Sequence, residues 1–194
     1  HVVLLSMGVV CTATPAIAVV GSVNVDITMQ VQRLPQQHET LTASVPSVEL
    51  ALGGKGANQA VAAKRLGAAV RFVGRLGRDG HGEWLQKILK TNGVDISGCT
   101  ESQNLPSGQG MVMLDAEGGA SSVVVGGANT DWTTFDLTTL ETTLKGASVL
   151  LLQQEIPEKI NLAAAKAGKA QGVLVIQDVG GEDRPISSDL LAVI

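Results

Sequence analysis

A glycine-rich turn at residues 52–58 carries residue types that could hold a small polar ligand. It opens the stretch LGGKGANQAVAAKRLG, in which an alanine-rich helical run follows directly. The unpaired N–H groups of a helix N-terminus attract oxygen-rich ligands, and glycines let a ligand approach the backbone closely. The alternative is a glycine-rich turn entering an ordinary core helix, and the pattern matches neither GxxxxGK[ST] nor GxGxxG. The candidate binding residues here are Gly53, Gly54, Lys55, Gly56 and Asn58.

Acidic and amide side chains follow three apolar runs of the chain. Asn24 and Asp26 come after AIAVVGS, Glu155 comes after SVLLLQ, and Asp178 ends VLVIQD. Carboxylates accept hydrogen bonds from neighbouring hydroxyls, and each bond to a charged group contributes roughly 1.5–3 kcal/mol. Taken singly, Asp26 could be a solvated turn carboxylate, and Glu155 a charge that complements the start of the helix after it. Together with the glycine-rich turn they favour a site for a polyol.

The elements that must position these groups alternate between strands and helices. Short apolar, β-branched runs predict buried strands at 16–22, 70–74, 148–153 and 173–178. Helical patterns lie between and after them, at 55–67, 81–92, 133–145 and 157–170. This alternation predicts an α/β fold with a mostly parallel central sheet and flanking helices, whose ligand lies at the carboxyl ends of the strands.

Two segments break this alternation. The stretch TLTASVPSVEL at 40–50 alternates apolar and polar residues, and GMVMLDAEGGASSVVV at 110–125 predicts a hairpin that turns at 117–119. Alternating strands are usually half-exposed, so we expect these segments to form a small β flap over one edge of the central sheet. A pair of extra edge strands is the alternative that the pattern leaves open.

Composition excludes several classes of function. The 194 residues have a formal net charge of −4, 2% aromatic residues and no tyrosine, so we expect no nucleic-acid binding. The three histidines, His1, His38 and His81, lie in unrelated contexts. Cys11 and Cys99 are far apart and lack metal-ligand spacing. We therefore expect neither a metal site nor a disulfide framework.

The two ends of the chain also lead to expectations. Residues 1–15 begin with His and contain an apolar stretch that is too short and interrupted to span a membrane. We expect them to be a leader remnant or a translation artefact, and we expect no membrane association. The chain stops within ISSDLLAVI, an apolar run without a cap, so we expect residues 16–194 to be the N-terminal part of a domain whose C-terminal portion is missing.

The motifs also resemble those of a known family. VVGSVNVDI followed by LGGKGANQAVAAKRLGA is similar to the ribokinase group of the phosphofructokinase-B-type carbohydrate kinases, and GRLGRDGHGEWL, GGAN and LLLQQEIP follow in the expected order. The resemblance implies ATP-dependent phosphorylation of D-ribose at its 5-hydroxyl, with Mg²⁺ and a monovalent cation such as K⁺. It also implies a Rossmann-like domain whose β-sheet lid, here near 40–50 and 110–125, covers the sugar and commonly forms a homodimer contact.

Carried over by motif, the resemblance also implies roles for individual residues. Asn24 and Asp26 would hold ribose hydroxyls, Glu155 would take a further hydroxyl, and the turn would grip the sugar from the other side through Gly54, Lys55 and Asn58. The family's GAGD-type motif, which carries the catalytic base, is missing up to Ile194. We therefore assign no catalytic residue, expect the ATP site beyond residue 194, and expect the chain alone to be inactive.

Three alternatives remain beside this interpretation. The chain could be a non-catalytic carbohydrate-binding module, or it could belong to a related sugar or nucleoside kinase. A nicotinamide-dependent oxidoreductase is disfavoured because GSVNVD lacks the glycine fingerprint expected after the first strand. Where bacterial ribokinases tend to have Asn-Pro-Ala-Pro, this chain has QDVGGEDRP, which leaves the role of Asp178 open. A cytoplasmic or organellar location, the plastid included, is expected.

Overall fold

The computed structural model describes residues 16–181 and 185–194, so the expected leader at 1–15 lies outside the described residues. The central sheet has four strands: β1 (Ala16–Val20), β4 (Ala69–Val73), β9 (Val149–Gln154) and β10 (Leu174–Gly181). Their order is β10-β9-β1-β4 and every pairing is parallel. The predicted α/β fold with a parallel central sheet is therefore confirmed.

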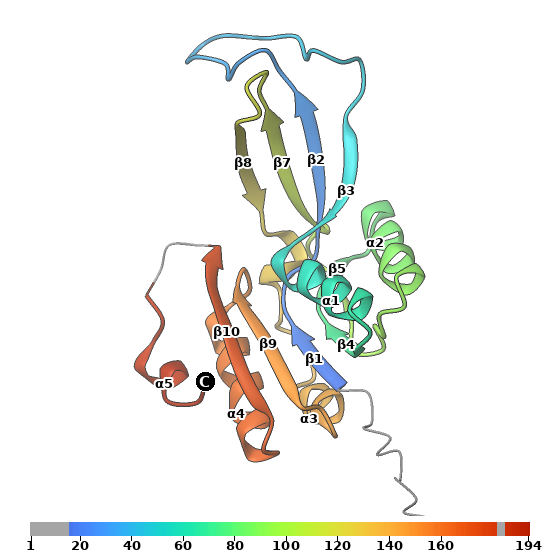
Figure 1. Cartoon of the computed structure of the whole chain (residues 1–194), viewed down its shortest axis with the longest axis vertical. Coiled ribbons are helices and arrows are strands. Elements are labelled where there is room, and N and C mark those ends of the chain that lie inside the picture. The colour runs from blue at the N-terminus through green and yellow to red at the C-terminus, as the bar shows by residue number, and fades with distance from the viewer. Residues whose placement is uncertain (1–15, 182–184) are drawn as a thin grey trace, which may run out of the picture.

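Helices cover both faces of this sheet (Figure 1). On one face, α1 (Lys55–Arg65) and α2 (Gly80–Thr91) pack in a hydrophobic cluster that includes Val19 and Phe72. On the other face, α3 (Thr138–Leu144) and α4 (Glu158–Ala170) share a second cluster with β1, β9 and β10, which also reaches the short α5 (Ser188–Leu191). Helix α3 is shorter than the helix predicted at 133–145.

The late start of α3 has a local cause. The carboxylate of Asp136 accepts hydrogen bonds from the N–H of Thr138 (2.9 Å) and from its hydroxyl (2.8 Å), so it satisfies donors of the first helical turn. Before it, Trp132 and Phe135 stack edge to face, with ring centroids 4.8 Å apart, and both are buried. Residues 131–137 are thus a packed loop, whose apolar residues mimic a helical pattern.

A second, mixed sheet of four strands stands above the central sheet (Figure 1). We call it the outer sheet; it consists of β2 (Asn24–Gln30), β3 (Glu49–Gly53), β7 (Gly108–Leu114) and β8 (Ala120–Val125), in the order β3-β2-β7-β8. The two central strands, β2 and β7, are parallel to each other, whereas the outer pairs β2–β3 and β7–β8 are antiparallel. The β7–β8 hairpin matches the predicted one.

Two details of the outer sheet differ from the sequence prediction. Residues 40–48 form bends and irregular backbone, and the strand expected there begins only at Glu49. The segment 24–30 is a strand of its own, whereas the sequence analysis predicted a strand only at 16–22 in this part of the chain. Proline and the surrounding serines disfavour a strand in 40–48, because proline cannot donate to a sheet ladder.

The remaining elements connect the two sheets. A short parallel pair, β5 (Arg75–Gly77) and β6 (Thr100–Ser102), and a 3₁₀ turn, η1 (Gly127–Thr130), lie at the base of the outer sheet. The carboxyl ends of β1, β9 and β10 point toward this base (Figure 1). The junction of the two sheets is therefore where strand-end side chains meet.

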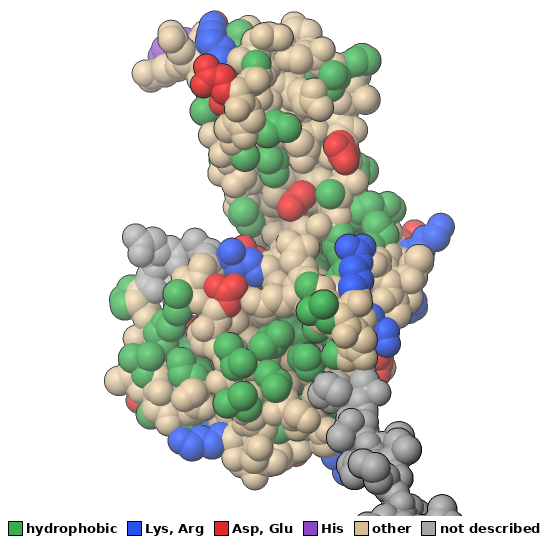
Figure 2. Space-filling view, in the orientation of Figure 1, with side chains coloured by type: hydrophobic (Ala, Val, Ile, Leu, Met, Phe, Trp, Pro, Cys, Tyr) green, Lys and Arg blue, Asp and Glu red, His purple; other side chains and the backbone are tan. Residues whose placement is uncertain are grey.

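One face of the central sheet stays open at its β10 edge. Val173 and Val175 pack toward α4, while the alternate residues Leu174 and Ile176 are exposed. The space-filling view shows an apolar area over the lower body, where β9 and β10 lie (Figure 2). Within the described part of the chain, no helix is long and apolar enough to cross a membrane.

Candidate functional site

The strand β2 presents two candidate residues side by side. Asn24 and Asp26 are two positions apart, so their side chains lie on one face of the outer sheet. Their partners on the neighbouring strand β7 are Gly108 and Gly110. A β-carbon on Gly108 would clash with Asn24 Oδ1, and one on Gly110 would clash with Asp26 Oδ1. The two glycines therefore leave the room that both polar side chains occupy.

The carboxylate of Asp26 is half-buried and lacks an internal partner. It accepts no hydrogen bond from any residue within 16–181 or 185–194. Burial, and then the charge of Glu155, raise the pKa of Asp26 above its usual value. Because a third glycine, Gly53 on β3, also leaves space beside this carboxylate, its oxygens stay free to accept hydroxyl hydrogens.

Glu155 lies across the junction, directly after β9. Its Oε2 accepts hydrogen bonds from Ser22 Oγ (2.6 Å) and from the backbone N–H of Lys55 (2.9 Å). Glu155 therefore complements the N-terminus of α1, a helix 100 residues earlier in the chain, and not the helix that follows it. Its second oxygen, Oε1, accepts no hydrogen bond within the described residues, so it is also available to a ligand.

The glycines of the turn serve packing within the protein. Gly54 has a φ of 84°, and β-carbons on Gly54 or Gly56 would lie 2.8 Å from backbone atoms of residues 22–23. This contact lets α1 begin directly against the loop that follows β1. The sequence interpretation gave this space to a ligand, but the structure fills it with protein backbone.

The first amides of α1 are likewise used internally. The N–H of Gly56 donates to Ser22 Oγ (3.4 Å), that of Ala57 donates to Ser22 O (2.9 Å), and that of Asn58 donates to Gly54 O (2.9 Å). With the Lys55 amide bonded to Glu155, none of the amides of residues 55–58 is left for an oxygen-rich ligand. In this structure these helix N–H groups are used within the protein, so the unused donors of the turn are side chains, and ligand binding by the turn stays a prediction.

Those side chains are Lys55 and Asn58. Neither the Lys55 ammonium nor the Asn58 amide has a hydrogen-bond or ion-pair partner in the part of the chain that the structure describes. Asn58 is exposed and Lys55 is half-buried at the first position of α1. The turn therefore offers unused donors: the backbone of Lys55 contacts Glu155, and its ammonium lies next to Gly180.

Asn129 is a site residue that sequence reasoning did not assign. It lies in η1, is buried, and donates through Nδ2 to Asn24 Oδ1 (2.7 Å). The same side chain makes two hydrogen bonds with the backbone of Val23: Asn129 Oδ1 accepts from the Val23 N–H (2.9 Å), and Nδ2 donates to the Val23 carbonyl (3.1 Å). Asn129 thus fixes which end of the Asn24 amide is available. The GGAN motif marked this position, but only as a family landmark.

Asp178 comes to the same edge of the central sheet, on β10. Its Oδ1 accepts from the N–H of Gly180 (2.7 Å), and its Oδ2 accepts from Gln59 Nε2 (3.1 Å) on α1. Both carboxylate oxygens therefore have partners in the protein. Asp178 differs in this respect from Asp26, whose oxygens are free.

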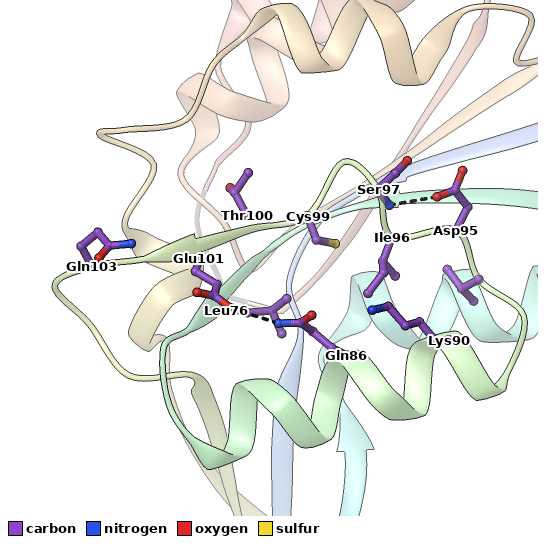
Figure 3. Close-up of a pocket in the computed structure, with 11 residues that line it drawn as sticks. Leu76, Gln86, Lys90, Asp95, Ile96, Ser97, Cys99, Thr100, Glu101 and Gln103 are labelled. Atoms are coloured by element: carbon purple, nitrogen blue, oxygen red, sulfur yellow. Dashed lines mark hydrogen bonds between the residues drawn. The ribbon is translucent and has the colours of Figure 1, made fainter.

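A cavity of about 710 Å³ lies elsewhere, between α2 and the β5–β6 pair (Figure 3). None of the candidate site residues lines it. Two pairs of its polar groups bond to each other: Gln86 Nε2 donates to Glu101 Oε1 (3.2 Å), and the Ser97 amide donates to Asp95 (2.9 Å). Burial raises the pKa of the Cys99 thiol to about 12, so it is no nucleophile at neutral pH. The cavity shows no convergent chemistry.

The junction is better suited to a polyol than to a metal ion or a phosphate. Among residues 16–181 and 185–194, no group of three or more His, Cys, Asp or Glu side chains could hold a metal ion. The amides of residues 55–58 are bonded within the protein, so this turn does not cradle a phosphate. The arrangement instead combines free carboxylate oxygens with free donors, as recognition of a polyhydroxylated molecule requires.

Comparison with known proteins gives the family. The model of the pfkB family carbohydrate kinases matches residues 14–194. The chain belongs to this family. Ribokinase from Arabidopsis thaliana is 42% identical over 180 residues, which cover 91% of this chain and 47% of that protein. Ribokinase from Bacillus subtilis is 42% identical over 144 residues, which cover 74% of this chain and 48% of that protein.

Solved structures of the family agree with the fold. The structure of Arabidopsis thaliana ribokinase complexed with ribose and ATP superposes with a TM-score of 0.80 at 41% identity, over 93% of this chain and 58% of that one. The chain thus spans about half the length of the curated kinases that it matches. The α/β core and the mixed outer sheet are therefore those of a ribokinase-like carbohydrate kinase.

Proposed function

We propose that this chain carries the sugar-binding part of an ATP-dependent ribokinase, which phosphorylates D-ribose at its 5-hydroxyl. The observation that carries the proposal is the half-buried carboxylate of Asp26, which has no partner in the described protein and faces the charge of Glu155. Two carboxylates near each other are costly unless a ligand donates to them. Similarity to the ribose- and ATP-bound Arabidopsis enzyme supports ribose as that ligand.

Each residue then has a role in holding the sugar. Asp26 and Glu155 accept hydrogen bonds from ribose hydroxyls, and Asn24, oriented by Asn129, contacts a further hydroxyl. Lys55 and Asn58 donate from the first turn of α1, whose shape depends on Gly53, Gly54 and Gly56. Together they select the arrangement of hydroxyls around the ring and orient the 5-hydroxyl for transfer.

ATP supplies the phosphoryl group when it is bound. None of the described residues is assigned to ATP, Mg²⁺ or K⁺, and no residue up to 194 is assigned as the catalytic base. Phosphoryl transfer depends on positioning and on charge stabilisation at the phosphate. The residues described here contribute the positioning of the acceptor sugar, so the 194-residue chain by itself should show no ribose-dependent ADP release.

We also propose that the outer sheet closes over the sugar as a lid, and that it forms a homodimer contact. Its edge strand β8 exposes three successive valines, Val123, Val124 and Val125, with relative exposures of 62%, 54% and 51%. Exposed apolar edge strands are usually covered by a partner. Ribose should slow hydrogen exchange in segments 40–50 and 110–125; equal exchange with and without sugar would contradict the lid.

The central test is a titration of D-ribose by calorimetry into the intact protein in which this chain occurs. We expect Asp26→Asn to weaken ribose binding about 100-fold, since it removes a charged acceptor of two hydroxyl bonds. The matched control is Asp189→Asn, at an exposed position of α5 that makes no side-chain hydrogen bond in the described protein. Equal affinities for the wild type and Asp26→Asn would remove Asp26 from the site.

A second measurement separates kinase from binding module. The intact protein is incubated with ATP, Mg²⁺ and K⁺, and ADP release is followed with and without D-ribose. Sugar-dependent turnover supports the kinase, whereas ribose binding without turnover supports a non-catalytic carbohydrate-binding protein. Titration of 2-deoxyribose in parallel tests the choice between close sugars. The 194-residue chain alone, measured in the same assay, tests whether these residues suffice.

A further inference from the structure

The proposed sugar site leaves Asp178 without a task, although it lies at the same edge of the central sheet. A line of hydrogen bonds runs from its carboxylate through two glutamine side chains. Gln59 Nε2 on α1 donates to Asp178 Oδ2 (3.1 Å), and Gln153 Nε2 on β9 donates to Gln59 Oε1 (2.8 Å). Three elements, β10, α1 and β9, are thus joined by side chains at the base of the proposed site.

The carboxylate sets the direction of this line. A carboxylate only accepts hydrogen bonds, so Gln59 must turn its NH₂ group toward Asp178 and its oxygen toward Gln153. Gln153 must then turn its NH₂ group toward Gln59, which leaves its own Oε1 pointing the other way. That oxygen is fully buried and has no hydrogen-bond partner among the described residues. It lies against Gly21, where any β-carbon would clash with it.

Asp178 also lies close to the lysine of the turn. A β-carbon on Gly180 would lie 3.1 Å from Asp178 Oδ1 and 3.2 Å from Lys55 Nζ. The carboxylate and the ammonium therefore flank one glycine, without the 4 Å contact of a salt bridge. The line of amides thus starts beside the cation that the proposed site uses.

We propose that Asp178 is a positioning residue. It sets the direction of the Gln59 and Gln153 amides and thereby holds the first turn of α1, with Lys55, against the carboxyl ends of β9 and β10. The proposal rests on the proposed function, because the turn that it holds is the one assigned to the sugar. Asp178 itself is not assigned to the sugar, because both of its oxygens already have protein donors.

The consequence of Asp178→Asn follows from donor counting. The introduced asparagine keeps its oxygen on the Gly180 amide, so its NH₂ group meets the NH₂ group of Gln59. Flipping both glutamines removes that conflict but presses the NH₂ group of Gln153 against the backbone of Gly21. The first arrangement leaves a part-buried donor without an acceptor and the second leaves a fully buried one, and either destabilises the first turn of α1.

A charge relocation tests this inference in the intact protein. In Gln59→Glu two carboxylates face each other, but in the double variant Gln59→Glu/Asp178→Asn the new glutamate accepts from both the introduced asparagine and Gln153. We expect each single variant to lower Tm by about 2–4 °C and to weaken D-ribose binding about tenfold. The double variant should return to within about twofold of the wild type in affinity. Asp189→Asn, the control for a lost charge, should change neither quantity.

The outcomes are distinct. A double variant as weak as Asp178→Asn, or single effects that simply add, would overturn the proposal, because the direction of the amides would then not matter. If Asp178→Asn does not fold, recovery of folding in the double variant supports the proposal and its absence overturns it. If the wild type binds no ribose, the proposed function falls, and non-additive Tm changes still decide the role of Asp178.

Discussion

Two polar clusters lie at the junction of the sheets, and they differ in how completely their groups are paired. In the first, which we call the Arg75 cluster, the buried guanidinium donates to Asp131 O (2.7 Å), Thr100 Oγ1 (2.5 Å) and Thr134 Oγ1 (3.1 Å). The Asp131 carboxylate accepts from Ser102 Oγ (2.5 Å) and from Thr133. These bonds lower its pKa to about 2.

The second cluster contains Asp26, Glu155 and Lys55, and it has acceptors and a donor that nothing in the described protein uses. Burial and a like charge raise the pKa of Asp26, the opposite of the shift at Asp131. Both clusters combine a basic side chain with at least one carboxylate. The comparison teaches that the two clusters differ in pairing: the paired cluster stabilises the fold, and the unpaired one is the cluster that we propose to bind the sugar.

Breaking the paired cluster should have the largest effect on stability. Arg75→Met removes every donor of the guanidinium and leaves Asp131 without its nearby positive charge, so we expect a loss of about 3–5 kcal/mol in the free energy of unfolding. Urea denaturation measures it. The matched control is Arg78→Met, whose exposed pair with Glu101 (3.8 Å) should be worth about 0–1 kcal/mol. Equal losses would erase the distinction between the clusters.

Asn129 bonds both to the buried backbone of Val23 and to the candidate site residue Asn24, so its removal should affect both stability and binding. Asn129→Ala leaves the buried amide of Val23 without an acceptor and frees the side chain of Asn24. We expect a loss of about 1–3 kcal/mol in unfolding free energy and weaker ribose binding. Denaturation and calorimetry on the same preparation check this. A variant that loses stability but keeps full affinity would show that Asn24 needs no orientation.

One carboxylate oxygen of Glu155, Oε2, is paired within the protein, and the other, Oε1, is free among the described residues. Glu155→Gln keeps an acceptor for Ser22 and Lys55 but removes the charge and the free Oε1. We expect a stability loss of about 0.5–1 kcal/mol from the helix terminus and about tenfold weaker ribose binding. Glu158→Gln, in the first turn of α4, is the matched control. Unchanged ribose affinity would assign Glu155 to the helix alone.

Asp26 should give the smallest change in stability, and one of opposite sign. Its folded pKa is raised, so the native state binds more protons than the unfolded state, and stability falls as pH rises through that window. Asp26→Asn should therefore raise Tm slightly at pH 7, and the gain should shrink on acidification below the raised pKa.

Asp131 is the contrast, since the stabilisation that its carboxylate provides is lost only as pH falls from about 3.8 toward about 2. Scanning calorimetry across the acidic to neutral range measures both. A lower Tm for Asp26→Asn at neutral pH would mean that the carboxylate has a partner.

The sequence predicted most of the central fold because the relevant patterns are local. Apolar β-branched runs and amphipathic repeats located four parallel strands and the helices α1, α2 and α4 within a few residues. Strand β2 was missed because NVDITMQ follows the first strand after only three residues and has no turn of its own. The 40–50 segment alternates as a strand would, yet its ladder with β2 begins only at Glu49; before that residue a single bond, from Ser44 N to Gln30 O (2.7 Å), joins it to the end of β2.

The candidate site was predicted less completely, because its pairing depends on distant contacts. The polar residues Asn24, Asp26 and Glu155 could be chosen from strand ends, and the structure brings them to one junction. That Glu155 contacts the amide of Lys55, 100 residues away, has no local signature. The glycines opposite Asn24 and Asp26, Gly108 and Gly110, do have a local signature, because they form a Gly-x-Gly pattern at the start of an apolar strand. The cellular location stays a prediction.

The short connection from β1 to β2 has a mechanical consequence. Only residues 21–23 separate the two strands, so the chain passes from the central sheet to the outer sheet beside the site. Asp26 is therefore carried by the outer sheet, whereas Glu155 follows a strand of the central one. The like charges of the two carboxylates oppose a closer approach of the sheets at this point. A molecule that donates a hydroxyl hydrogen to each carboxylate would offset this repulsion and bridge the two sheets.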